Sequence, residues 1–219
     1  VHWQTGGEVF IVHGSASGVA DPSLAKADTI LSDVYSDGLE YGFGLRVQTA
    51  GDINGDGFDD VIAGHPYSNS SSVNIYNYGF AYILYGSSTD ISDGEIQTVA
   101  DVKLSGEVAH METGYSVATA GDVNGDGHSD VVVGAPGGGK YKEGAAYMFL
   151  GSSSGISDMA MTSADTMLTG RNADDSAGSD VQTAGDINGD GYDDVIMGAP
   201  GSDAFASDAG SAYIFLGSN

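Results

Sequence analysis

Short apolar stretches separated by polar, glycine-rich stretches run along the whole chain. The apolar stretches are rich in Val, Ile and Tyr, as at residues 115–120 and 130–134, and the residues between them are mostly Gly, Asp, Asn and Ser. β-Branched and aromatic residues favour strands, whereas Gly, Asn, Asp and Ser favour tight turns. The pattern therefore predicts an all-β fold of short strands joined by turns.

Parts of this pattern are internal copies. Three segments, residues 44–66, 114–136 and 178–200, align without gaps around an Asp-rich loop. A second element, in which an aromatic strand ends in a Gly-Ser turn, occurs four times. Its closing glycines are Gly14, Gly86, Gly151 and Gly217.

A third, weaker apolar stretch follows each complete copy, at residues 27–32, 99–106 and 164–170. A unit of about 65 residues therefore holds four short strands: one before the Asp-rich loop, one after it, the aromatic strand and the outer stretch. Such a unit cannot bury both of its faces alone, so the repeats predict the four-stranded antiparallel blades of a β-propeller.

The whole chain, 1–219, is interpreted as one propeller region. It divides into a partial blade at 1–40 and blades at 41–106, 107–170 and 171–219. Three blades and a fraction cannot close a ring, since closed propellers have about four to eight blades. We therefore expect either contact with further repeats of a larger propeller or association of several copies into a ring or filament.

The motif residues resemble the FG-GAP repeat of integrin α-subunit propellers, a family that bacterial surface proteins and some secreted phospholipases also resemble. Phe43-Gly44 matches the opening dipeptide, and Gly134-Ala135-Pro136 and Gly198-Ala199-Pro200 match the closing tripeptide. Gly64-His65-Pro66 is an altered form of that tripeptide. The resemblance covers nearly the whole chain and implies a propeller fold.

The chemistry of the chain lies in the three Asp-rich loops, 52–60, 122–130 and 186–194. Each loop has oxygen-bearing side chains at positions 1, 3, 5 and 9 and glycine at positions 4 and 6. Calcium takes six to eight oxygen ligands, and position 7 can add a backbone carbonyl. An EF-hand would need Glu at position 12, where Ala63, Val133 and Met197 stand instead. The resemblance instead implies that the aspartate at position 9 is the closing ligand, able to bind through both oxygens.

Three Ca²⁺ sites are therefore predicted. Turn formation alone is the competing interpretation, but several carboxylates repeated at the same place in each unit would repel one another without a cation. Magnesium fits less well, because it requires near-ideal octahedral geometry. The predicted ligands are Asp52, Asn54, Asp56, Phe58 and Asp60 in the first loop, Asp122, Asn124, Asp126, His128 and Asp130 in the second, and Asp186, Asn188, Asp190, Tyr192 and Asp194 in the third. Asp59, Ser129 and Asp193, at position 8, are expected to point away.

Two catalytic motifs occur by chance. Residues 151–155 fit G-x-S-x-G, but the sister repeats read GSASG and GSSTD there, so the serine is not special, and the motif needs a following helix. Residues 134–140 approach a phosphate-binding loop, but Tyr141 stands where Ser or Thr is required. No catalytic residue is predicted.

The remaining polar and aromatic residues give weaker signals. Most tyrosines are interpreted as packing residues, whereas Tyr67, Tyr76 and Tyr78 could line a sugar or protein contact. Asn69 begins a glycosylation sequon that matters only in a eukaryotic secretory setting. The histidines are interpreted as solvated or packing residues; they are His2, His13, His65, His110 and His128.

The charge and composition of the chain disfavour several classes of partner and of binding site. The net charge is −25 and cysteine is absent, which disfavours nucleic acid, anionic membranes, disulfides and thiolate metal sites. No apolar run is long enough for a membrane helix, and a start at Val1 suggests a mature product or a fragment.

We expect an extracellular or cell-surface protein that is not an enzyme: a calcium-stabilised adhesion or scaffold module with a protein or glycan partner at its rim loops. The alternative is a non-catalytic accessory domain of a secreted hydrolase or phospholipase. The partner, the number of blades in a complete assembly and the source organism do not follow from the sequence.

Overall fold

The computed structural model describes residues 7–16, 23, 27–33, 42–69, 76–204, 206 and 209–218. Almost all regular structure is strand. The elements are β1 (Glu8–Ile11), β2 (Thr29–Ser32), β3 (Arg46–Gly51), β4 (Asp60–His65), β5 (Phe80–Leu84), β6 (Gly94–Glu95), α1 (Ile96–Val99), β7 (Val102–Ser105), β8 (Ser116–Gly121), β9 (Asp130–Ala135), β10 (Ala145–Phe149), β11 (Met159–Ala160), the 3-10 turn η2 (Met161–Ser163), β12 (Thr166–Thr169), β13 (Asp180–Gly185), β14 (Asp194–Ala199) and β15 (Ser211–Phe215).

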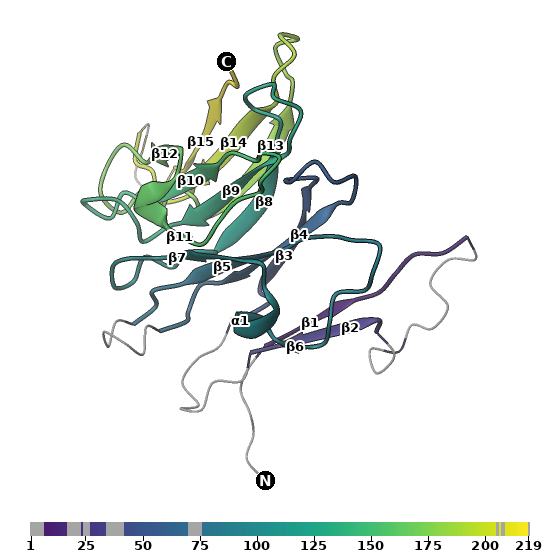
Figure 1. Cartoon of the computed structure of the whole chain (residues 1–219). Coiled ribbons are helices and arrows are strands. Elements are labelled where there is room, and N and C mark those ends of the chain that lie inside the picture. Colours follow the sequence, from purple (N-terminus) through teal and green to yellow (C-terminus); the bar gives the residue numbers. More distant parts are fainter. Residues whose placement is uncertain are drawn as a thin grey trace.

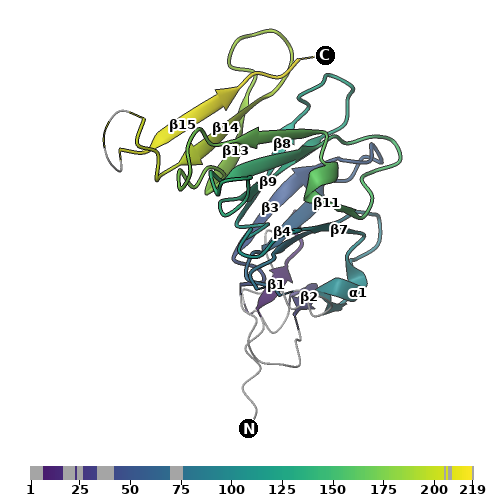
Figure 2. The ribbon, with the colours of Figure 1, turned by 90° about the vertical axis from the view of Figure 1, so that its left-hand side faces the viewer.

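These strands form four sheets that follow one another along the chain. Their strand orders are β1-β2-β6, β11-β7-β5-β4-β3, β12-β10-β9-β8 and β13-β14-β15, here called the first to fourth sheets. Figure 1 shows the sheets fanned from the N-terminal pair to the C-terminal sheet, and Figure 2 shows β13–β15 at the opposite end from β1 and β2. The predicted all-β fold of antiparallel, blade-like sheets is confirmed, and the described residues form no closed ring.

The antiparallel order within each sheet follows the predicted strand roles. β8 pairs with β9, β9 with β10 and β10 with β12, all antiparallel. The first strand of each of the last three sheets contacts the first strand of the next, with β8 between β3 and β13. These three sheets therefore meet along their first strands. The exact blade boundaries stay a prediction.

Burial differs between the middle and the end of the fan. All residues of β9 and β10 are buried, as expected for strands covered on both faces. β15 occupies the position of β10 in the fourth sheet, yet its side chains alternate between half-buried and exposed. The fourth sheet therefore has one face without a neighbouring sheet among the described residues.

The connections from third to fourth strands reach back to the preceding sheet, which the sequence pattern did not predict. β6 pairs in parallel with β2, and β11 pairs in parallel with β7. Each of these ladders is only two residues long, too short to leave a periodic signal. The same connections carry α1 and η2, whose first residues Ile96 and Met161 are fully buried.

Glycine backbones allow neighbouring sheets to approach closely. A Cβ atom at Gly64 would overlap the carbonyl oxygen of Gly114, and one at Gly134 would overlap that of Gly178. The corresponding Gly198 has no atom nearer than 3.8 Å to such a Cβ. The glycine that opens the closing tripeptide is therefore required only where another sheet packs against it.

His65 replaces alanine in this tripeptide and forms a buried polar contact between the first and second sheets. Its Nε2 lies 3.4 Å from Oδ2 of Asp33, and both side chains are buried. The Phe43 ring packs edge-on against the imidazole, with 5.9 Å between centroids. Burial, with a smaller effect from Lys103, lowers the pKa of His65 to about 4, and burial raises the pKa of Asp33.

Substitution of Gly134 by alanine is expected to destabilise the protein by about 1–3 kcal/mol, because the new methyl group must displace the Gly178 backbone. Gly198→Ala is the matched control and should leave stability unchanged or slightly raised. Urea unfolding of both variants measures the difference. Equal stability of the two variants would show that the sheets do not pack through this glycine.

Acid is expected to unfold the protein partly through His65. The folded pKa lies below the unfolded value, so the stabilising contribution is complete above about pH 6.5 and is lost as the pH falls toward 4. The loss amounts to about 3 kcal/mol. Denaturant unfolding from pH 7 to pH 4 measures it, with His65→Ala as the comparison because sister repeats carry Ala135 and Ala199. If the variant loses as much stability as the parent protein over this range, the assignment to His65 is wrong.

Candidate metal centres

The three Asp-rich loops occupy the same place in three successive sheets. They connect β3 to β4, β8 to β9 and β13 to β14. Each hairpin has a register shift just before the loop, after which a glycine pairs with the aspartate at position 9. The loops therefore share one backbone geometry.

The side chains at positions 1, 3 and 5 turn toward amide groups of their own loop. In the middle loop, Asp122 Oδ1 accepts hydrogen bonds from the N–H groups of Gly125 and Asp126, at 2.7 and 3.0 Å, and its Oδ2 accepts one from Gly127 at 2.9 Å. Asn124 Oδ1 accepts from the N–H of Asp126 at 3.0 Å.

The position 5 carboxylate continues the same network. Asp126 Oδ1 accepts from the N–H of His128 at 2.9 Å, and its Oδ2 accepts from the Asn124 amide at 3.0 Å. The first and third loops repeat nearly all of these bonds, centred on Asp52 and Asp186. The oxygen atoms are thus held in one orientation by the backbone before any ligand is considered.

The aspartate at position 9 is buried in all three loops, with Asp60 1% exposed and Asp130 and Asp194 fully buried. One carboxylate oxygen accepts from the N–H at position 2, at 2.8–3.0 Å. The other accepts from the closing glycine of the aromatic strand, at 2.8–2.9 Å; these glycines are Gly86, Gly151 and Gly217. The closing aspartate therefore ties its loop to the third strand of the same sheet.

The direction in which the pKa of a loop aspartate is shifted depends on how deeply its side chain is buried. Burial raises the pKa of Asp130 to about 6, opposed by its two N–H donors, and the charges of Asp126 and Asp122 raise it further. Burial likewise raises the pKa of Asp60. The exposed Asp186 has a lowered pKa because backbone N–H groups, that of Gly191 foremost, stabilise its charged form.

Neighbouring loops are joined through position 8. The N–H of Ser129 donates to the Asp52 carbonyl at 3.0 Å, and the N–H of Asp193 donates to the Asp122 carbonyl at 3.1 Å. Asp193 Oδ2 in turn accepts from the Asp122 N–H at 2.9 Å. In these two loops, the residue at position 8 contacts the preceding loop. It therefore has a structural role, which the sequence did not reveal.

The donor set fits a hard cation. The side-chain atoms offered at positions 1, 3, 5 and 9 are carboxylate or amide oxygens, and most of the carboxylate oxygens accept a single N–H, which leaves each of these a second lone pair; Oδ1 of Asp122 and Oδ1 of Asp186 each accept two. Within the described residues, no three His, Cys, Asp or Glu side chains form a group that could hold a metal ion. A site here therefore depends on the asparagine amide oxygen and backbone carbonyls as well as on the carboxylates.

The position 7 residues Phe58, His128 and Tyr192 donate their N–H groups to the position 5 carboxylates. The role of their carbonyl oxygens as metal ligands stays a prediction.

The other sequence motifs show no catalytic arrangement. The turn at 151–155 follows β10 and leads to the short β11 and η2, and the segment 134–140 leads to β10. Neither runs into the helix that its motif requires. Tyr82 and Tyr147 pack in the core, Tyr67 packs edge-on against Tyr115, and Tyr76 is 56% exposed. Residues 70 and 71 of the sequon, like His2, lie outside the described residues.

No helix among the described residues has the length and apolar character needed to cross a membrane.

Comparison with known proteins shows the same repeat. The FG-GAP repeat model matches residues 43–84, 113–149 and 177–215, together more than half of the chain. The chain is 32% identical to integrin alpha pat-2 of Caenorhabditis elegans over 158 residues, which cover 68% of the chain and 12% of that relative.

Two further relatives extend the comparison. Identity to integrin alpha-V of Gallus gallus is 29% over 202 residues, covering 70% of the chain and 20% of the relative. Identity to phosphatidylinositol-glycan-specific phospholipase D of Dictyostelium discoideum is 29% over 203 residues, covering 87% of the chain and 21% of the relative. The chain thus spans about a fifth or less of the length of these relatives. On the three matched repeats and the blade-like sheets, the chain belongs to the FG-GAP repeat family.

Proposed function

We propose that this chain is a calcium-binding, calcium-stabilised extracellular module for adhesion or scaffolding. The observation that carries the proposal is the threefold recurrence of one loop geometry, in which three oxygen-bearing side chains are oriented by backbone amides beside a buried carboxylate. In each loop, positions 1, 3, 5 and 9 would supply side-chain oxygens and position 7 a carbonyl oxygen to one Ca²⁺.

A bound cation would act first on stability. Burial raises the pKa of Asp130 and of Asp60, and the neighbouring carboxylates of the same loop raise it further; a divalent ion would reverse this repulsion. Binding to the folded state alone adds about 2.7 kcal/mol per site at a hundredfold excess of ligand over Kd. Extracellular modules bind calcium with Kd of about 0.1–1 mM, so millimolar calcium outside cells would suffice.

The proposed adhesive or scaffolding role is supported by the integrin alpha relatives and by an exposed face of the fourth sheet. The integrin alpha relatives support a protein or glycan ligand at the rim loops and an extracellular or cell-surface location. Ile187 is 54% exposed, whereas Ile53 and Val123, at the same loop position, are covered by the next sheet. This exposed face would pack against further repeats or another copy. We assign a structural role to the hydrogen-bond network of the Asp-rich loops and no catalytic activity to the chain.

A second candidate is a non-catalytic accessory domain of a secreted enzyme. The similarity to the phospholipase D covers more of the chain than the integrin similarities reported above. Assays of phosphodiester hydrolysis with and without calcium on this chain, and on the gene product that contains it, separate the two candidates. Metal-dependent turnover by the chain itself would overturn its non-catalytic assignment.

Calcium titration of the metal-free protein is expected to show three equivalents bound and a higher melting temperature, which EDTA reverses. Asp126→Ala should remove one equivalent, because it takes one carboxylate from the middle loop. Ser129→Ala is the matched control at position 8 and should keep all three. Isothermal titration and scanning calorimetry measure both quantities. Three equivalents retained by Asp126→Ala would reject the ligand assignment.

The closing aspartate has a second, metal-independent effect. In EDTA, Asp130→Ala is expected to cost about 2–5 kcal/mol, because the buried N–H groups of Val123 and Gly151 lose their acceptor. Asp126→Ala should cost no more than about 1 kcal/mol under the same conditions, since its partners are exposed. Denaturant unfolding compares the two. Similar losses would mean that the closing carboxylate has no special structural role.

A further inference from the structure

The start of the first Asp-rich loop is held by the sheet that follows it. The N–H of Ser129 donates to the Asp52 carbonyl at 3.0 Å. The N–H of Ser152, after β10, donates to the Ile53 carbonyl at 3.0 Å. Positions 1 and 2 of this loop are therefore each fixed by a backbone hydrogen bond from the third sheet.

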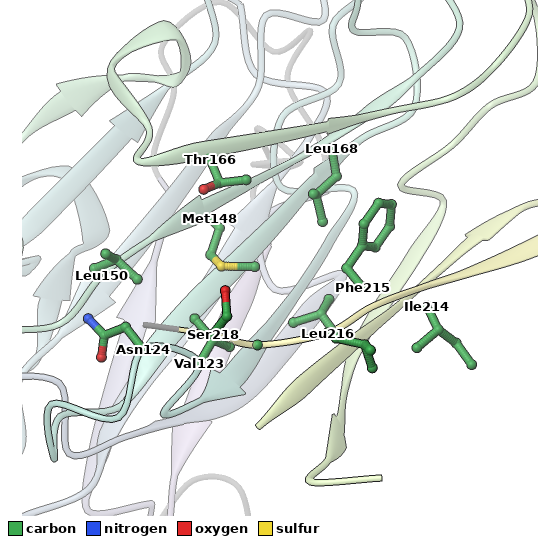
Figure 3. Close-up of a pocket in the computed structure, with 12 residues that line it drawn as sticks. Val123, Asn124, Met148, Leu150, Thr166, Leu168, Ile214, Phe215, Leu216 and Ser218 are labelled. Carbon is green, nitrogen blue, oxygen red and sulfur yellow. The ribbon is translucent and has the colours of Figure 1, made fainter. Parts of the chain in front are cut away.

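The middle loop is held by the fourth sheet in the same way. The Asp193 N–H donates to the Asp122 carbonyl at 3.1 Å, and the Ser218 N–H donates to the Val123 carbonyl at 3.0 Å. Figure 3 shows Val123 beside Ser218, at the edge of a groove of about 490 Å³ between the third and fourth sheets. The backbone contacts of the two loops are thus equivalent.

One side chain makes the difference between the two loops. Asp193 Oδ2 accepts a hydrogen bond from the Asp122 N–H at 2.9 Å, so Asp193 holds both the N–H and the carbonyl of Asp122. The residue in the same place one sheet earlier is Ser129. Among the side chains that the structure describes, none accepts a hydrogen bond from the Asp52 N–H.

The space for this contact is present in both loops. A Cβ atom at Gly121 would overlap Oδ2 of Asp193, and one at Gly51 would overlap Oγ of Ser129. The glycine before position 1 therefore leaves room for the side chain at position 8 of the next loop. Because position 8 is aspartate in the first and third loops, aspartate in place of Ser129 is compatible with the hairpin.

Asp122 is the residue on which the oxygen atoms of the middle loop are centred. Its carboxylate accepts hydrogen bonds from the N–H groups of Gly125, Asp126 and Gly127. Groups that do not touch a metal commonly orient the groups that do. A backbone already fixed at Asp122 loses less freedom when an ion binds, which favours binding.

We propose that Asp193 is a positioning residue for the middle calcium site, a role that rests on the proposed calcium binding of the loops. Its carboxylate fixes the backbone of Asp122 and so the direction in which the carboxylate at position 1 is presented. Asp193 belongs to the next repeat, so the middle site is built from two repeats. The first site lacks this side-chain contact.

Charge alone is the competing explanation, because a nearby carboxylate attracts a cation whatever its hydrogen bonds. Asn in place of Asp193 separates the two effects, since its amide oxygen can accept from the Asp122 N–H without carrying a charge. Ser in place of Asp193 reproduces the residue found at position 129. The hydrogen bond predicts that Asn preserves calcium affinity and that Ser does not.

The test uses the full chain with Asp56→Ala and Asp190→Ala, so that only the middle loop can bind calcium. In this background, Asp193→Ser is expected to weaken calcium binding about tenfold, as is typical for loss of a group that orients a metal ligand. Asp193→Asn should restore most of this loss. Isothermal titration calorimetry measures the Kd, and each variant should still bind one equivalent.

The converse variant is Ser129→Asp in a chain with Asp126→Ala and Asp190→Ala, which keeps only the first loop. It is expected to strengthen calcium binding about tenfold, because it gives the Asp52 N–H the acceptor that it lacks. A residue that served only the packing of its own sheet would not transfer this effect. This variant also keeps the proposal testable if Asp193→Ser does not fold.

The outcomes distinguish this role from calcium binding itself. An unchanged Kd in Asp193→Ser, or equal losses in Asp193→Ser and Asp193→Asn, would overturn the positioning role while calcium binding stands. Lower stability of Asp193→Ser in EDTA with an unchanged Kd would likewise overturn it. If the parent chains with one intact loop bind no calcium, the proposed function and the positioning role both fail.

Discussion

The structure depends on one buried interaction, the aspartate at the end of each Asp-rich loop. Its two oxygens accept hydrogen bonds from the start of its own loop and from the glycine that ends the third strand. A buried carboxylate is costly unless it is well hydrogen-bonded, and here two backbone donors reduce that cost. The same contact fixes the loop against its sheet, so the proposed metal ligands are oriented by the fold itself.

The contacts between sheets depend on glycine residues and on short connecting segments. Glycine at the closing tripeptide lets the backbone of the next sheet approach, and the third-to-fourth-strand connection extends back to pair with the preceding sheet. The third sheet is therefore linked to the second through its edge strand, its close backbone packing and its loop. Stability in such an array is close to a sum of units and their interfaces, which makes an uncovered end sheet the weakest part of the fan.

The fourth sheet is built like the others but is partly uncovered among the described residues. Its strands, loop and closing aspartate are formed like those of the other sheets, yet β15 remains partly exposed and the groove beside it is open.

The sequence by itself determined the strands, the loops and their repetition, because alternation of apolar residues and turn chemistry act over a few neighbouring residues. It also placed the candidate oxygens at positions 1, 3, 5 and 9, since these positions depend only on spacing within one loop. Only the tertiary structure decided that Asp130 bonds to Gly151, that Asp193 contacts Asp122, and that Met159 pairs with Leu104. These contacts join residues far apart in the chain or in different sheets. They arise from the way the sheets stack, and a stacking geometry leaves no periodic pattern in the sequence.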